Sequence, residues 1–310
     1  MSIEYFREDP IFKIKTPLLF AHRGGAREIP ESTVMGFNHA LNEAKADVLE
    51  LDVQLTCDGE FVVWHGPRLD NVRIAGENNC PTERPRERRK IYHYNWDELD
   101  GRAWVADPPE LKPEKDEIDL SNVPEDEDRQ LLLLSDFLTK FPDTPLNIEM
   151  KKSFKRKIND TDRKGLKDNI RAFTEILNND PNNRTIVVVS VHDDYIDEFR
   201  DISDNKYPTG LSIQEQLYLL FFKMKMKNRA LETTYDSTYS GVKTIEKVRE
   251  AGGSTFVFLT GFGPILPAID KKIPSEEKIF KILDRGVDGI MTDRPASIRP
   301  IIDRWKTNRG

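Results

Sequence analysis

Short apolar runs alternate with helix-like patterns along most of this 310-residue chain. The runs are nearly continuous and rich in Val, Ile, Leu and Phe, which is typical of parallel strands buried on both faces. The predicted strands are 17–22, 48–55, 61–65, 146–150, 185–191, 254–259 and 287–291, with weaker ones near 207–212 and 229–234. The predicted helices cover 33–44, 161–178, 242–251 and 275–285. This alternation predicts an α/β fold assembled from βαβ units.

The number of strands and the chain length fit a (β/α)₈ TIM barrel, which needs about 250 residues, with an insertion after the second strand region. A doubly wound open sheet is the alternative. Residues 71–129 interrupt the alternation because they are rich in Pro, Glu, Arg and Asp. A structureless loop of that length is improbable inside a compact domain. We therefore expect one domain over 1–310, with an insertion at about 71–129 that has some structure of its own.

The composition narrows the class of partner and compartment. Lys and Arg total 47 and Asp and Glu total 54, for a net charge of −7, so no nucleic-acid partner is expected. Cys57 and Cys80 cannot form a disulfide framework, and no run reaches the about 20 apolar residues of a membrane span. Charges also interrupt the first 20 residues, unlike a signal peptide. A soluble, cytoplasmic protein is expected.

Charged side chains follow or lie within two of the predicted strands. The first strand runs into His22 and Arg23, followed by two glycines, and the second contains Glu50 and Asp52. Alternate side chains of a strand face the same way, so both carboxylates project to one side. Polar residues at carboxyl strand ends face the mouth of a parallel barrel, where active sites are built. A carboxylate pair there favours a hard cation such as Mg²⁺ or Ca²⁺.

Two further segments add to this set. An Asp-Gly turn after the second strand predicts that the next strand folds back beside it, which brings His65 near the carboxylates. Glu149 and Lys151 share one face of a later strand. Burying so many charges without a ligand or metal would cost several kcal/mol. The set suits phosphodiester cleavage, with cations neutralising phosphate oxygens and two histidines serving as acid and base. Asp293, after the last strand, is expected to tie down the adjoining loop.

Four segments, AHRGGAREIPEST, LELDVQLTCDGEFVVWH, LNIEMKK and GVDGIMTDRP, resemble the glycerophosphodiester phosphodiesterase family in sequence and in order. The resemblance implies a TIM barrel of the phosphatidylinositol-phospholipase-C-like type and one divalent cation, Mg²⁺ or Ca²⁺. It also implies hydrolysis of glycerophosphodiesters to sn-glycerol 3-phosphate and an alcohol, by a route through a cyclic phosphate or without one. By position, it implies His22 and His65 as the acid/base pair, Glu50, Asp52 and Glu149 as metal ligands, Arg23 and Lys151 as phosphate-binding groups, and Glu31 as a supporting residue.

The sequence departs from the family pattern at two informative places. Gly66 follows His65 where the family usually has aspartate, so something else must orient that ring. Residues 258–261, FLTG, replace the usual aromatic-Thr-Val-Asn pattern and alter one wall of the pocket. Two alternatives stand beside the leading function. One is phospholipase-D-like cleavage of lysophospholipid or sphingomyelin, and the other is a catalytically silent barrel that binds phosphodiesters.

The segment 218–227, YLLFFKMKMK, has two interpretations. It could be an outer barrel helix that packs on a strand. Alternatively, it could form an apolar lip with adjacent lysines that makes weak contact with a membrane surface.

Overall fold

The computed structural model describes residues 6–77, 89–108, 120–155, 162–234, 241–259 and 274–309. Eight parallel strands pair in a closed ring, because β1 pairs with both β11 and β2, and the sheet runs β1-β11-β10-β9-β8-β7-β6-β2. The barrel strands are β1 (Leu18–His22), β2 (Val48–Leu55), β6 (Leu146–Met150), β7 (Ile186–Val189), β8 (Thr209–Gly210), β9 (Arg229–Thr234), β10 (Ser254–Phe258) and β11 (Gly289–Thr292). The chain is a TIM barrel, as the alternation predicts, and not an open sheet.

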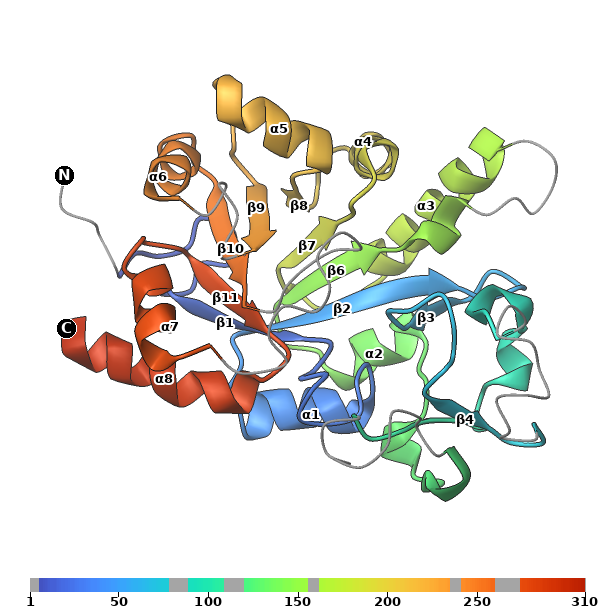
Figure 1. Cartoon of the computed structure of the whole chain (residues 1–310). Helices are drawn as coiled ribbons and strands as arrows, with labels where there is room; N and C mark the ends of the chain where they lie inside the picture. The colour runs from blue at the N-terminus through green and yellow to red at the C-terminus, as the bar shows by residue number, and fades with distance from the viewer. Residues whose placement is uncertain are drawn as a thin grey trace.

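Helices surround the barrel (Figure 1). They are α1 (Val34–Asn42), α2 (Leu134–Lys140), α3 (Asp162–Asn178), α4 (Asp193–Ile202), α5 (Ile213–Phe221), α6 (Val242–Glu250), α7 (Glu276–Leu283) and α8 (Pro295–Arg309). The Thr33 side chain caps α1 by accepting the Gly36 amide at 3.1 Å. The sequence patterns predicted α1, α3, α6 and α7 to within a few residues. They missed α2, α4 and α8, and α5 begins earlier than the predicted apolar segment.

The alternation of side chains along β2 explains how the barrel is filled. Leu49, Leu51 and Val53 are fully buried in a cluster with residues of α1, α2, α3 and α4 outside the barrel. Val48 belongs to a separate cluster in the interior, with Phe20 and other residues. Glu50 and Asp52 follow Val48 on the same inward face. Hydrophobic packing on the outer face of β2 therefore fixes two carboxylates inside the mouth.

Three short strands and several 3₁₀ helices form additional structure beside the barrel. β3 (Phe61–Val63) pairs antiparallel with β2, as the Asp-Gly turn predicts, although it ends two residues before His65. Within the expected insertion, β4 (Val72–Ile74) pairs with β5 (Ala103–Val105). Short 3₁₀ helices cover 91–93, 96–98, 120–122 and 127–129, and another covers 152–155 after β6. Residues 78–88 and 109–119 of the insertion lie outside the described residues.

Candidate active site

Three buried carboxylates gather where β2 and β6 run side by side. The parallel register places Glu50 opposite Asn147 and Asp52 opposite Glu149. Ligand oxygens of Glu50, Asp52 and Glu149 lie within 4.8 Å of one another. The three residues are no more than 8% exposed, so the group is buried rather than a solvated acidic patch. The structure brings together the carboxylates that the sequence singled out.

His22 lies beside this group at the end of β1. The β1–β2 register pairs His22 with Glu50, and the imidazole Nε2 is 3.7 Å from a Glu50 oxygen. The other ring nitrogen, Nδ1, is 2.5 Å from Asp293 Oδ1. An anionic carboxylate at that position favours the tautomer that carries its proton on Nδ1. Asp293 thus orients the His22 ring, a role beyond the loop-fastening expected from the sequence.

His65 lies in the loop after β3, close enough to Asp52 for the two side chains to interact electrostatically. Burial lowers the pKa of its imidazole to about 3, and although the Asp52 charge opposes this, Arg23 and Lys151 add to it. The imidazole is therefore neutral near pH 7. Gln54 Nε2 donates a hydrogen bond to the His65 backbone carbonyl at 2.9 Å. Within the described part of the chain no hydrogen bond reaches the His65 ring, consistent with Gly66 supplying no side chain to orient it.

Two cations cross-link the acidic group. Lys151 Nζ is 2.7 Å from Asp52 and 2.8 Å from Glu149. Arg23 Nε is 3.2 Å from Asp52, and Arg23 Nη1 is 3.1 Å from Glu31. Glu31 therefore supports the arginine directly. The phosphate-binding role expected of both cations stays a prediction.

The loop after β1 is tight, and Arg23 itself has a positive φ of 54°. A Cβ on Gly24 would come within 2.8 Å of the Gly36 backbone carbon. The close approach that this glycine permits is thus to helix α1 rather than to a ligand. It brings the first turn of α1 against the loop that carries Arg23.

The electrostatics of the three carboxylates differ. Burial and the neighbouring Asp52 charge raise the pKa of Glu50 well above its usual value, and burial raises that of Glu149 despite Lys151. Burial alone would raise the pKa of Asp52 too, but the charges of Lys151 and Arg23 hold it below its usual range. The carboxyls of Glu50 and Glu149 resist ionisation because, if all three carboxyls ionised, the site would hold an excess of negative charge. A hard divalent cation with oxygen ligands would relieve that excess, so the residues present fit such an ion.

The expected insertion lies beside the part of the barrel mouth that carries Arg23 and His65. Its apolar residues, including Val72, Ile91 and Val105, pack around Trp64, whose indole N–H donates to the Arg68 carbonyl at 3.1 Å. This packing fixes the segment next to His65. A cavity of about 290 Å³ lies between Arg23, Arg27, Glu31 and Asp293 on the barrel and Asn71, Ala106 and Pro108 on the insertion.

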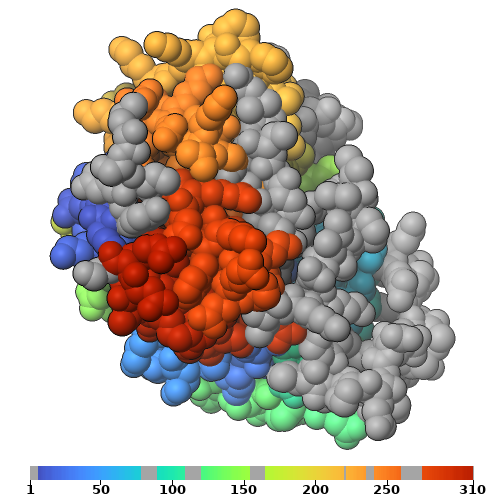
Figure 2. Space-filling view, turned by 60° about the vertical axis from the view of Figure 1, so that its left-hand side comes forward, coloured from blue at the N-terminus to red at the C-terminus, as the bar shows by residue number. Residues whose placement is uncertain are grey.

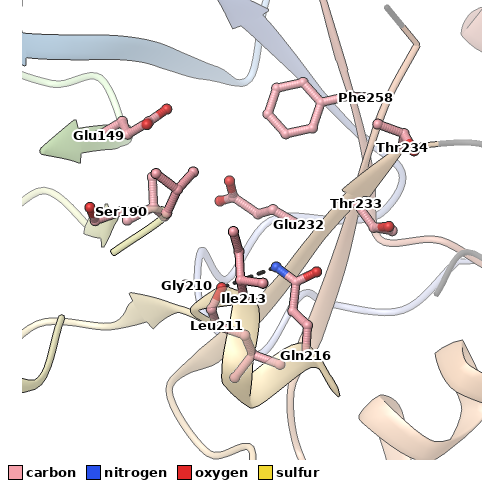
Figure 3. Close-up of a pocket in the computed structure, with 12 residues that line it drawn as sticks. Glu149, Ser190, Gly210, Leu211, Ile213, Gln216, Glu232, Thr233, Thr234 and Phe258 are labelled. Carbon is pink, nitrogen blue, oxygen red and sulfur yellow. Dashed lines mark hydrogen bonds between the residues drawn. The ribbon is translucent and has the colours of Figure 1, made fainter. Parts of the chain in front are cut away.

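A second cavity, of about 270 Å³, occupies the opposite side of the mouth (Figure 3). It begins at Glu149 and is lined by carboxyl-end residues of β7, β8, β9 and β10 and by the start of α5. Five of the twelve lining residues are large and apolar, namely Val189, Val191, Leu211, Ile213 and Phe258. The Phe258 ring meets the His22 ring edge-on, with centroids 5.6 Å apart. Phe258 is the first residue of the 258–261 segment, which differs from the usual family pattern. Residues 260 and 261 of that segment lie outside the described residues.

One titratable group in this cavity was not anticipated. Glu232, on β9, points into the cavity (Figure 3) and accepts a hydrogen bond from Asn147 Nδ2 at 2.5 Å. Burial raises the pKa of Glu232 to about 7. β9 was only a weak strand prediction, so nothing assigned its alternate residues to the barrel interior. The neighbouring Thr233 and Thr234 belong to no recognisable motif that would have marked Glu232 as a site residue.

Comparison with known proteins places these residues in a family. Residues 22–297 match the model of the Glycerophosphoryl diester phosphodiesterase family. A glycerophosphodiester phosphodiesterase of Caldanaerobacter subterraneus is 49% identical over 55 residues, which is 18% of this chain and 22% of that protein. The human protein named Lysophospholipase D GDPD3 is 31% identical over 144 residues, 46% of this chain and 37% of that one. The matches thus span well under half the length of these curated relatives.

Solved structures agree on the fold. A structure titled as a putative glycerophosphoryl diester phosphodiesterase from Silicibacter pomeroyi superposes with a TM-score of 0.66 at 18% identity, covering 93% of this chain and 95% of that one. One from Galdieria sulphuraria gives 0.61 at 16% identity, covering 94% and 98%. The match of the family model, which begins at His22 and includes every carboxylate described above, decides the assignment. The chain belongs to the glycerophosphoryl diester phosphodiesterase family.

Proposed function

We propose that this protein hydrolyses glycerophosphodiesters to sn-glycerol 3-phosphate and a free alcohol. The supporting observation is the convergence of Glu50, Asp52 and Glu149 within 4.8 Å beside His22. Such a buried group is costly unless it binds a cation, and a cation there would face any phosphate that entered the mouth.

The three carboxylates would hold one divalent cation, Mg²⁺ or Ca²⁺. When bound, this ion would polarise the phosphodiester and neutralise charge on its non-bridging oxygens. Arg23 and Lys151 would bind the same oxygens from either side, with Glu31 holding the guanidinium in place. The phosphate would thereby be oriented before any proton moves.

His22 and His65 would act as the acid/base pair. The Asp293 carboxylate would keep the His22 proton on Nδ1, which leaves Nε2 to take a proton from the attacking hydroxyl. The uncharged His65 imidazole would lie on the side of the leaving group. The departing alcohol oxygen would take a proton from His65 as its bond to phosphorus breaks, and His65 would regain a proton from His22, so that both rings end neutral. The attacking group, glycerol hydroxyl or water, is open in this proposal.

The test is turnover of a panel of glycerophosphodiesters with Mg²⁺ or Ca²⁺, with products identified by mass. We expect glycerol phosphate and alcohol, loss of the reaction with a chelator, and recovery when the ion is returned. Metal-dependent binding of glycerophosphocholine with no product on long incubation would instead establish the silent binding barrel. Unchanged rates with chelator would show that the carboxylates have another role.

A second candidate is cleavage of lysophospholipids in the manner of a phospholipase D. The apolar cavity beside Glu149 favours it, because an acyl chain needs such a wall next to the phosphate. The human relative is named for this activity. Turnover of lysophosphatidylcholine far above glycerophosphocholine would establish it, whereas equal or lower turnover would leave the first proposal. The cytoplasmic location expected from the sequence stays a prediction.

A further inference from the structure

Helix α5 presents an apolar face to the outside of the molecule. Ile213, Leu217, Tyr218 and Phe221 lie on one helical face, and this face is exposed, with Phe221 at 76%. Phe222, the next residue, is exposed too. Apart from Phe6 and Val242, all the exposed large apolar side chains in the described residues belong to this face, to Phe222 or to Val191.

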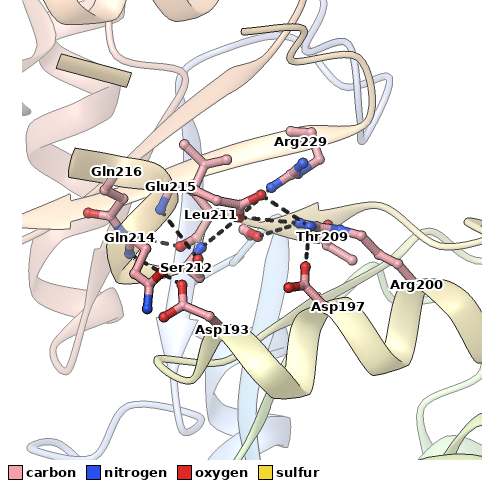
Figure 4. A network of polar contacts seen from close by, with 11 residues as sticks. Asp193, Asp197, Arg200, Thr209, Leu211, Ser212, Gln214, Glu215, Gln216 and Arg229 are labelled. Atoms are coloured by element: carbon pink, nitrogen blue, oxygen red, sulfur yellow. Dashed lines mark hydrogen bonds and ion pairs between the residues drawn. The ribbon is translucent and has the colours of Figure 1, made fainter. Parts of the chain in front are cut away.

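The inward side of α5 is held against the protein by the fully buried Leu219 and by a polar network at the start of the helix (Figure 4). Glu215 contacts Arg200 of α4 at 3.1 Å and Arg229 of β9 at 2.5 Å. Ser212 and Glu215 also form a capping box at the start of the helix. These ion pairs fix the rotation of α5 about its axis. The apolar face is therefore presented by a rigid helix rather than exposed by a loose one.

The exposed face continues into the apolar cavity of the active site. Ile213 is both the first residue of α5 and a lining residue of that cavity, and the exposed Val191 stands at the same rim. The gold atoms of α5 and its flanks form the upper edge of the molecule in the space-filling view (Figure 2). A layer that covered α5 would thus lie next to the opening of the cavity.

Positive charge borders this face. Lys223, Lys225 and Lys227 are exposed directly after α5, and residues 216–231 contain no acidic residue. This contrasts with the net charge of −7 for the chain. A twofold contact between two copies would bring the like-charged lysines together. An anionic lipid surface would neutralise them while it accepted the apolar side chains.

We propose that the exposed face of α5, together with Phe222 and the three lysines, docks this protein on an anionic membrane surface. The apolar cavity would then open toward the lipid, so that an amphiphilic phosphodiester could move from the bilayer to the carboxylates. Only this last step rests on the proposed function. None of the described helices is long and apolar enough to cross a membrane.

The test is sedimentation of the full chain with vesicles of phosphatidylcholine alone or with phosphatidylserine added. We expect binding to the anionic vesicles at low salt and release at high salt. Leu217→Ser/Phe221→Ser should lower the partition coefficient about tenfold or more, and Lys223→Glu/Lys225→Glu by a similar factor. Lys45→Glu/Lys140→Glu, an equal charge change near α1 and on α2, and Phe6→Ser should bind like the unaltered protein.

Glycerophosphocholine turnover, measured on the same samples, separates the two proposals. We expect Leu217→Ser/Phe221→Ser to leave it unchanged, because neither side chain lines the site. Vesicle binding without any turnover would retain the docking surface and reject the proposed function. The docking surface would be overturned if the unaltered protein did not bind anionic vesicles at low salt. It would also be overturned if Leu217→Ser/Phe221→Ser and Lys223→Glu/Lys225→Glu both bound these vesicles as well as the unaltered protein does. A dimer that the Leu217→Ser/Phe221→Ser variant dissociates, while vesicles bind neither protein, would overturn it as well.

Discussion

The two sides of the barrel mouth differ in chemistry although the same fold builds both. The side formed by β1, β2, β6 and β11 carries the carboxylates, His22, Arg23 and Lys151, tied together by ion pairs. The side formed by β7 to β10 is an apolar cavity with one buried carboxyl, Glu232. Glu149 lies on the border and belongs to both. In the second proposed function, the charged side would bind the phosphate and the apolar side would bind the acyl chain.

Substitution of His22 tests the charged side with the largest expected effect. We expect His22→Ala to lower kcat for a glycerophosphodiester by about 10²- to 10⁴-fold, because the proton acceptor is lost. His93→Ala, at an exposed histidine of the insertion, is the matched control and should retain full activity. Steady-state rates at saturating substrate measure both. If His22→Ala retained the turnover of the unaltered protein, His22 would not be the proton acceptor of the reaction.

The buried carboxyl of the apolar side provides a stability test. The pKa of Glu232 is raised to about 7 from 4.5, so the folded protein holds a proton that the unfolded chain releases between these values. The free energy of unfolding should therefore fall as pH rises from about 4.5 to 7, by on the order of 3 kcal/mol. Glu232→Gln should remove this loss and be the more stable protein at pH 8, with little difference at pH 4.

Denaturant unfolding of both proteins at the two pH values measures this effect. Glu246→Gln, at an exposed glutamate of α6, should show no comparable pH-dependent gain. A Glu232→Gln difference that is the same at pH 4 and pH 8 would mean that the apolar side does not desolvate its carboxyl.

Asp293 tests whether orientation of His22 matters beyond its presence. Asp293→Asn keeps the shape but removes the charge that favours a proton on Nδ1. We expect kcat to fall on the order of 10- to 100-fold with little change in KM, and the pH profile of kcat to shift. If the fall in kcat is accompanied by a loss of folding stability and the pH profile of kcat is not shifted, Asp293 has only the loop-fastening role.

A substitution at the rim of the apolar cavity should have the smallest effect. Val191→Trp places a large ring at the opening, where the valine is 43% exposed and the core is not disturbed. We expect the ratio of lysophospholipid to glycerophosphocholine turnover to fall about tenfold. Val242→Trp, at a similarly exposed valine on α6, should leave the ratio unchanged. An unaltered ratio in Val191→Trp would mean that the acyl chain lies elsewhere.

The sequence predicts the charged side far better than the apolar side. Glu50 and Asp52 sit in a strand whose outward residues are all apolar, so alternation alone places both carboxylates inside. The apolar side combines ordinary residues from four strands and α5, and β8 is only two residues long. Gly210 of β8 has no recognisable pattern, yet a Cβ there would meet Val189 at 2.7 Å. Such contacts depend on the closed barrel, which local periodicity does not encode.

Divalent-cation binding to the protein and to Asp52→Asn, followed by calorimetric titration, tests the central claim most directly. The carboxylate group predicts one Mg²⁺ or Ca²⁺ per unaltered chain and loss of that binding in Asp52→Asn. Thermal unfolding curves should show that both proteins are folded under the conditions of the titration. Binding that is equal in the two proteins, or absent from the unaltered chain, would contradict it.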